Sequence, residues 1–227
     1  LDDAGTLTIS GTGEMDSYME IRTPWVDCKS IVIEEGVTSI GSRAFYECYV
    51  LTEITIPNSV TCVGAEAFGQ CVSMTDIALP EGLTSIGDRA FCWCHKLQRI
   101  FLPDSLITIG EFAFECCRNL KDIALPTGTT DIGKGAFDCC ASITAITIPS
   151  GMTGIPARMF SGCDSLVAVE IPEGVTSIGE GAFSFCRSLA SVVIPDTVTS
   201  IGYSAFYDCY NIKNLYITDI KSWCEID

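Results

Sequence analysis

The sequence predicts an α/β repeat solenoid, a right-handed coil of short strands and turns, from three observations. A 23-residue unit recurs eight times along the chain without an insertion or deletion. Every unit carries a phenylalanine and, three residues later, a cysteine. The apolar residues around them keep their places in the pattern G-x-x-A-F-x-x-C-x-x-L-x-x-I-x-I-P-x-x-V-x-x-I. A fixed period of this length is typical of solenoids, in which each unit packs on its neighbours.

Residues 1–30 differ from the repeats and are expected to form an N-terminal cap. Residues 6–9 read Thr-Leu-Thr-Ile, which alternates as a strand does, and residues 10–13 read Ser-Gly-Thr-Gly, a turn signal. This order predicts a hairpin, followed by Pro24 and Trp25 against the first coil. A cap is needed because the end of a solenoid otherwise exposes its core.

The tract L-x-x-I-x-I-P of each unit predicts a strand. In the third unit Ile100 and Leu102 point to one side and Phe101 points to the other. A proline, which cannot donate to a strand ladder, ends the tract. Stacked coils place such strands in parallel, about 4.8 Å apart. With the flanking residues 31–33 and 215–217, we expect about nine strands in one curved parallel sheet, within a solenoid of residues 31–217.

The tract G-x-x-A-F-x-x-C-x-x-L predicts a short helical or 3₁₀ turn on the convex side, because its apolar residues are three or four apart. One phenylalanine per coil then forms a spine inside the solenoid. The glycine that opens the tract indicates either a positive φ or a close approach of two backbones. In the sixth unit Pro156 replaces it, and proline excludes positive φ. We therefore expect either a local deviation there or no need for positive φ.

The repeats carry a family resemblance. The form I-G-x-x-A-F-x-x-C-x-x-L with a strand-ending proline resembles the BspA-like class of leucine-rich repeats. The opening residues 6–13 with Pro24 and Trp25, and the closing residues 217–220 with Trp223 and Cys224, are similar to the leader and exit segments of such bacterial proteins. The resemblance implies a right-handed leucine-rich-repeat solenoid in a secreted or surface-attached protein. Members of the class are described as adhesins for host matrix proteins or other cells.

The ends of the chain give two further expectations. The chain begins at Leu1 without a methionine or a signal-peptide pattern, so it is expected to be a piece of a longer protein. Residues 218–227 are expected to form a C-terminal cap or the start of a truncated region. The resemblance places the whole protein outside the cell or on its surface.

The charge balance disfavours several partners. Thirteen basic and 29 acidic residues give a net charge of −16. A nucleic-acid-binding protein needs a basic stripe that neutralises phosphates, so neither nucleic acid nor anionic lipid is an expected partner. No apolar run approaches the ~18 residues that a membrane span requires, and no membrane insertion is expected in this segment.

Fourteen cysteines invite disulfide, metal and catalytic interpretations. The column cysteines are expected to be reduced, buried thiols, because stacked Cβ vectors run parallel and stay too far apart for a bridge. Cys116 and Cys139, 23 residues apart, are the pair that the spacing favours if a disulfide exists. The C-x₂-C spacing of common zinc sites is missing. We expect no catalytic residues, no cofactor and no metal.

The outward side of the predicted strands is the candidate binding surface, because solenoids present such concave sheets to their ligands. Arg99 and Phe101 share one strand, and an exposed arginine beside an aromatic ring is the composition of interface hot spots. The alternative is that acidic neighbours only neutralise Arg99 and that Phe101 covers Ala78 and Ala124. The candidate ligand-binding residues are Asp76, Arg99, Phe101, Asp122, Glu170 and Tyr216.

Three functions remain open at this level. The first is a non-enzymatic, cell-surface or secreted module that adheres to host or microbial proteins through the concave sheet. The second is a carbohydrate-binding module, with aromatic rings on the convex side as stacking faces. Those rings are Tyr46, Tyr49, Trp93, Tyr207 and Tyr210. The third is a structural spacer that presents another domain.

Overall fold

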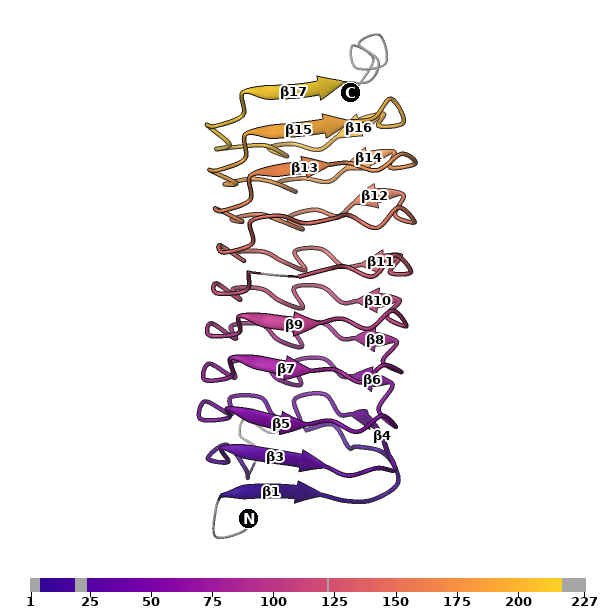
Figure 1. Ribbon diagram of the computed structural model, residues 1–227, viewed down its shortest axis with the longest axis vertical. Helices are drawn as coiled ribbons and strands as arrows, with labels where there is room; N and C mark the ends of the chain where they lie inside the picture. The colour runs from indigo at the N-terminus through magenta and orange to yellow at the C-terminus, as the bar shows by residue number, and fades with distance from the viewer. Residues whose placement is uncertain (1–4, 19–23, 122, 218–227) are drawn as a thin grey trace.

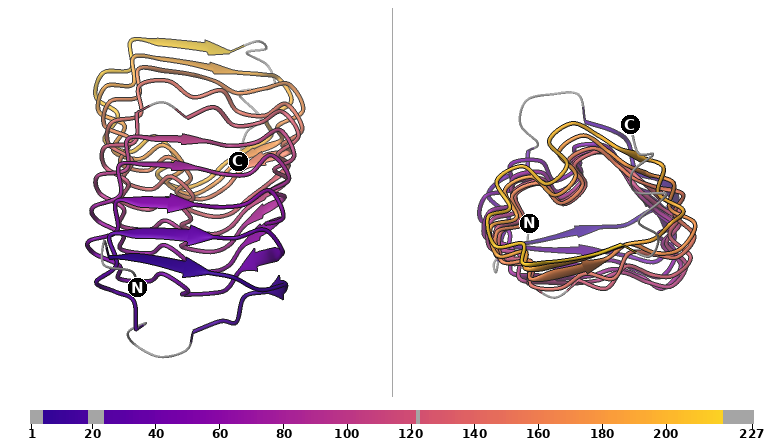
Figure 2. Two further views of the ribbon diagram at one scale, coloured as in Figure 1. Left: turned by 60° about the horizontal axis from the view of Figure 1, so that its bottom comes forward. Right: turned by 90° about the horizontal axis from the view of Figure 1, so that it is seen from above.

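The computed structural model is a stack of similar coils that rise from the N-terminus to the C-terminus (Figure 1). It describes residues 5–18, 24–121 and 123–217. Seen along the stack, the coils superpose, and each is indented on the side opposite the strands that face the viewer in Figure 1 (Figure 2). The predicted solenoid with parallel strands is therefore confirmed.

The first strand row carries the strands that the sequence predicts. Its members pair in parallel, and equivalent residues of successive coils are register partners, as in the pair Arg99 with Asp76. The row consists of β1 (Thr6–Ile9), β3 (Ser30–Ile33), β5 (Glu53–Thr55), β7 (Asp76–Ala78), β9 (Arg99–Phe101), β13 (Ala168–Glu170), β15 (Ser191–Ile194) and β17 (Asn214–Ile217).

The prediction of one continuous sheet is wrong. Within the described residues the first strand row forms three sheets, with the orders β1-β3-β5, β7-β9 and β13-β15-β17. Between β9 and β13 the described residues of two coils contribute no named strand to this row, and one isolated bridge joins Ala145 to Ala168. The alternating pattern is present in those coils, so it predicts the direction of the side chains and not the completeness of the ladder.

A second strand row lies along another side of each coil, and the sequence interpretation missed it. Its strands are mostly two residues long, too short for alternation to be recognised. They form one sheet with the order β11-β10-β8-β6-β4-β2 and another with the order β12-β14-β16. The strands are β2 (Gly13–Glu14), β4 (Val37–Ile40), β6 (Cys62–Val63), β8 (Ser85–Ile86), β10 (Thr108–Ile109), β11 (Asp131–Ile132), β12 (Gly154–Ile155), β14 (Ser177–Ile178) and β16 (Ser200–Ile201).

Pro156 explains where the second strand row is interrupted. In six other coils, the glycine after the strand donates its N–H to the preceding coil, as Gly133 does to the Ile109 carbonyl at 2.7 Å. Proline has no N–H, so this hydrogen bond cannot form at residue 156. The break between β11 and β12 lies at this coil. The glycine column as a whole serves close approach, since a Cβ on Gly110 would lie 2.5 Å from the Asp88 nitrogen.

The prediction of helical or 3₁₀ turns is wrong, because no helix is present in the described parts of the chain. The hydrogen bonds of the tract alternate between two kinds. Tyr46 and Cys48 donate to carbonyls three residues earlier, whereas Phe45 and Glu47 donate to the next coil, at 2.8 and 2.9 Å. Two residues per turn also have positive φ, such as Arg43 at 59° and Glu47 at 61°. Consecutive helical hydrogen bonds therefore cannot build up.

The prediction of an N-terminal hairpin is also wrong. β1 pairs in parallel with β3, with Leu7 opposite Ile31, and β2 pairs in parallel with β4. Residues 6–14 thus continue both strand rows by one coil, because Leu7 and Ile9 match the apolar places of β3. The division into residues 1–30, 31–217 and 218–227 stays a prediction, and residues 218–227, with Trp223 and Cys224, lie outside the described residues.

The core is a ladder of phenylalanines. Eight rings, from Phe45 to Phe206, stack with centroids 5.2 to 5.7 Å apart. Trp25 lies at the N-terminal end of this ladder, 6.4 Å from Phe45, and its indole Nε1–H donates to the Ala44 carbonyl at 2.7 Å. Trp25 therefore covers the first ring, as the sequence predicts for a cap.

Candidate binding surface

The sheet face, the outward surface of the first strand row, carries the candidate residues that sequence analysis selected. Alternation along β9 buries Ile100 and leaves Arg99 and Phe101 outside. Phe101 is 76% exposed, whereas eight other phenylalanines stack in the core. The surface therefore offers one large apolar ring to solvent.

Arg99 and Asp76 form an ion pair across β9 and β7. Arg99 Nε donates to Asp76 Oδ1 at 3.0 Å, and both side chains are at least half exposed. A hydrogen bond from the Thr75 side chain, and then the one from Arg99, lower the pKa of Asp76. Exposed ion pairs contribute little to stability, so Arg99 can exchange this partner for another at small cost. Asp122, the other predicted neighbour, lies outside the described residues.

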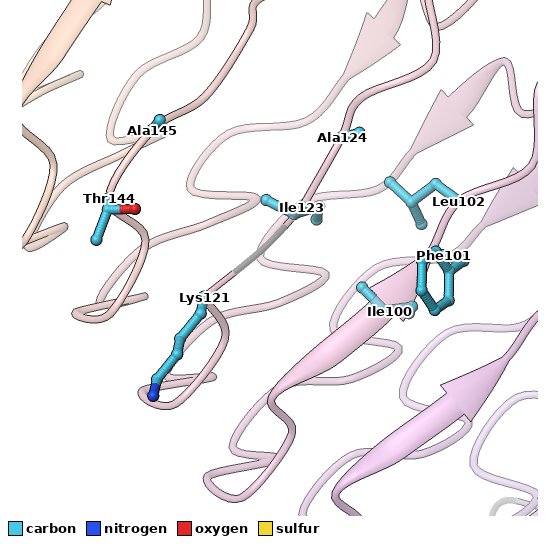
Figure 3. A pocket seen from close by; sticks show the side chains of 8 residues that line it. All are labelled: Ile100, Phe101, Leu102, Lys121, Ile123, Ala124, Thr144 and Ala145. Atoms are coloured by element: carbon cyan, nitrogen blue, oxygen red, sulfur yellow. The ribbon is translucent and has the colours of Figure 1, made fainter.

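A cleft of about 320 Å³ lies beside Phe101, where strand pairing stops after β9. Figure 3 shows the Phe101 ring at one side of it, Ala124 and Ala145 on the following coils, and Lys121 extending from the coil next to β9. Ala78 and Ala124 are both exposed. Phe101 therefore leaves part of both alanines open to solvent, and the choice between a binding role and a covering role of this ring stays a prediction.

Glu170 and Tyr216 form a second group on the sheet face. Glu170 ends β13, and its register partner Val193 on β15 is in turn the partner of Tyr216 on β17. Tyr216 is 55% exposed, and Glu170 lines a second cleft of about 400 Å³ with Thr147 and Ala168. The predicted residues thus fall into two groups, separated by the two coils whose described residues contribute no named strand to the first strand row.

Sequence analysis missed a second concave region, on the turn side of the last coils. A cleft of about 440 Å³ is lined there by residues that include Asp138, Arg158, Phe185 and Arg187. Asp138 is only 1% exposed, and Arg158 Nη2 lies 2.7 Å from its Oδ2. The sequence offered one signal for this region, the variable repeat position directly after the ladder phenylalanine, which Asp138 occupies. In the other units this position holds Tyr46, Gly69, Cys92, Glu115, Ser161, Ser184 and Tyr207.

The cysteine column is part of the core. Cys116 and Cys139 are both free thiols, and so are the column cysteines from Cys71 to Cys209. Column thiols donate to the phenylalanine carbonyl of the preceding coil, as Cys117 does to Phe91 at 3.1 Å. Burial raises the pKa of Cys139 to about 12 and that of Cys117 well above its ordinary value. Such thiols are poor nucleophiles at neutral pH.

We therefore predict a strong contrast in thiol labelling of the folded protein. At pH 8, iodoacetamide should modify the half-buried Cys62 at least about tenfold faster than Cys71, Cys94 or Cys117, because the thiolate is the reactive form and burial suppresses it. Mass spectrometry of tryptic peptides measures each rate. The contrast should vanish in denaturant, and equal rates in the folded protein would contradict the buried column.

Comparison with known proteins agrees with this architecture. The model of the BspA type leucine-rich repeat region matches six copies, over residues 25–140 and 84–213. No protein in the curated set matches the chain. The described part of the chain contains no helix with the length and apolar character that crossing a bilayer requires.

Solved structures of similar proteins are bacterial leucine-rich repeat proteins. One from Bacteroides ovatus shares 28% identity at a TM-score of 0.70, over 84% of this chain and 64% of its own. The leucine-rich repeat protein of T. pallidum shares 28% identity at a TM-score of 0.62, over 88% of this chain and 83% of its own. The pneumococcal vaccine antigen PcpA shares the fold at 17% identity and a TM-score of 0.54, over 95% of this chain and 66% of its own. With its family match extending over most of its 227 residues, the chain belongs to the BspA-type leucine-rich repeat family.

Proposed function

We propose that this chain is a non-enzymatic, extracellular or surface-exposed module that adheres to a protein of a host matrix or of another cell. Membership of a leucine-rich repeat family of surface proteins indicates a protein-binding module. The proposal adds the place of binding, the sheet face from β7 to β17, and the class of partner. The chain spans less than two thirds of the length of the Bacteroides ovatus relative, 64%, and the proposal concerns this part alone.

Phe101 is the observation that carries the proposal. A ring that is 76% exposed beside Arg99 matches the aromatic and arginine enrichment of interface hot spots. The 320 Å³ cleft next to it gives a partner side chain a place to enter. Burial of the ring by a partner would release its hydration water, which is the main driving force of protein association.

The second group extends the proposed contact surface along the solenoid. Glu170 and Tyr216 stand on the same face as Phe101, and the 400 Å³ cleft extends over residues 146–148, β13 and β15. A surface that extends over several coils suits a folded protein partner. With a net charge of −16, association with a basic partner should be faster at low than at high ionic strength.

The test is a surface-binding screen of the purified chain against immobilised extracellular matrix and cell-surface proteins. For a partner found this way, Phe101→Ala is expected to weaken affinity at least tenfold, about 1.4 kcal/mol. The loss follows from the missing ring, since Ala retains the backbone of β9. The measurement is the equilibrium dissociation constant by biolayer interferometry.

Tyr207→Ala is the matched control, because Tyr207 is an exposed aromatic residue, 58% exposed, on the turn side. It should leave the affinity of the protein partner unchanged. An unchanged affinity of Phe101→Ala would exclude this part of the sheet face. Glu170→Ala and Tyr216→Ala then show whether the contact reaches the second group.

A further inference from the structure

The turn side of the last coils carries a groove that the proposed adhesive function does not use. It is made of two adjoining clefts of about 440 and 260 Å³, and Arg158, Ser161 and Phe185 line both. We call it the turn groove. It belongs to the turn tracts, which form the indented side of the coils in Figure 2, away from the first strand row.

Ser161 is a buried hydroxyl without a partner in the described structure. It is 5% exposed and forms no side-chain hydrogen bond there. The other buried polar residues are satisfied: the Thr129 hydroxyl donates to Leu106, the Ser184 hydroxyl donates to Gly181, and Asp138 accepts from Arg158. A hydroxyl without a protein partner in the wall of both clefts is available to a ligand that supplies a hydrogen bond.

The charged groups of the turn groove are oriented and largely balanced. Arg158 donates from Nε and Nη2 to Asp138 Oδ2, at 3.1 and 2.7 Å. Arg187 Nη1 lies 2.9 Å from Asp164 Oδ1, and its Nη2 lies 3.6 Å from Asp208 Oδ2. Arg118 lines the larger cleft and Glu180 the smaller one, and their charges are opposite. The groove therefore holds planar donors and acceptors without a large net charge. A neutral ligand rich in hydrogen-bonding groups fits them better than an ion does.

Two aromatic rings provide flat apolar faces in the same groove. Phe185 is 38% exposed and Tyr207 is 58% exposed, and their rings meet edge to face with centroids 5.5 Å apart. The Arg187 guanidinium lies 5.6 Å from the centre of the Phe185 ring. The ligand must therefore combine hydroxyl groups with a compact apolar face.

The backbone of the turn groove is paired between coils, which disfavours an extended peptide as the ligand. Cys139 N–H donates to Ser161, Gly162 N–H to Ser184, and Phe185 N–H to Tyr207, at 2.6 to 2.7 Å. A peptide recognised by strand addition needs an open row of such groups. Recognition in this groove rests on side chains instead.

We propose that the turn groove binds a neutral saccharide. Its hydroxyls would donate to and accept from Ser161 and the Arg158–Asp138 pair, and the apolar face of a sugar ring would stack on Tyr207, the more exposed of the two perpendicular rings. The site is independent of the sheet face, because the residues that line its two clefts belong to the turn tracts. The chain thus has two binding surfaces, one for protein and one for glycan.

The experiment is a glycan array that holds neutral and acidic oligosaccharides, followed by calorimetric titration of the strongest neutral ligand. Ser161→Ala and Tyr207→Ala are each expected to weaken its affinity at least fivefold. Phe101→Ala should leave it unchanged, and this variant separates the turn groove from the sheet face. Circular dichroism checks the fold, and Ser161→Ala should melt no lower than the parent because it removes an unpaired hydroxyl.

Three outcomes would overturn the proposal. The first is the absence of any neutral saccharide above background on the array. The second is binding restricted to acidic glycans, which would contradict the balanced charge. The third is a neutral ligand whose affinity neither Ser161→Ala nor Tyr207→Ala changes. Loss of protein adhesion in Phe101→Ala, with or without glycan binding, bears only on the sheet face.

Discussion

Replacing Phe114 by alanine is expected to lower the free energy of unfolding by about 4 kcal/mol. The side chain is fully buried, and its ring stacks on Phe91 and Phe137 with centroids 5.3 and 5.4 Å apart. Truncation therefore removes two stacking contacts and leaves a cavity between two coils that cannot collapse onto it. Urea denaturation followed by far-UV circular dichroism measures the change.

Phe206→Ala is the matched control for this prediction. Phe206 occupies the same column at the end of the ladder, is only partly buried, and stacks on Phe183 alone among the described rings. Its loss should be about half that of Phe114, on the order of 2 kcal/mol. If both variants lost the same free energy of unfolding, the number of stacking neighbours would not determine how much a ring contributes to stability.

Gly110→Ala is expected to lower the free energy of unfolding by about 3 kcal/mol, a large effect for one methyl group. The new Cβ would lie 2.5 Å from the Asp88 nitrogen and 2.6 Å from the Gly87 carbonyl carbon. These are backbone atoms of the preceding coil, so relief of the clash must separate two coils and weaken the Gly110 N–H bond to Ile86, which is 2.8 Å long. Thermal and urea denaturation report the loss.

Gly82→Ala controls for the intrinsic effect of the substitution. A Cβ on Gly82 would lie 3.6 Å from the Asn58 carbonyl, which is ordinary contact, and its φ is not positive. Alanine there should change the stability by less than about 1 kcal/mol, in the stabilising direction, because it restricts the unfolded chain. A comparable loss in both variants would show that close approach of the coils is not what the glycine column provides.

The repeat period and the direction of the strand side chains could be predicted from the sequence because both are local and are repeated in every unit. Alternation around Ile100 places Arg99 and Phe101 outside, and the structure agrees. Hydrogen bonding could not be predicted in the same way. The turn tract has helical spacing, but Phe45 and Glu47 donate to the next coil, and a pattern within one unit does not contain the competing acceptors.

The N-terminal segment illustrates the same limit. Residues 6–13 have the pattern of a strand followed by a turn, and this order predicts a hairpin when only local sequence is considered. In the folded chain, β1 instead finds its partner in β3, 24 residues further on, because the apolar residues of both strands then join one core. The preference is set by burial against a distant segment, which local turn chemistry does not report.

The candidate sites divide along the same line. Asp76, Arg99 and Phe101 could be selected from their unit because they occupy outward places beside one another in register. The turn groove could not, because it requires Asp138 to be buried, Arg158 to reach it from the next coil, and Ser161 to lack a partner. Each of these is a property of contacts between coils.

The sequence by itself determined the solenoid, its period, its phenylalanine core and the face on which the strands display their variable residues. These four features follow from the periodic pattern, because each coil repeats the same local conformation. Only the tertiary structure decided how the ladder is interrupted after β9 and at Pro156, which hydrogen bonds replace helical turns, and where Ser161 is left unpaired. These features depend on the exact approach of one coil to the next, which is governed by backbone contacts that the repeat pattern does not encode.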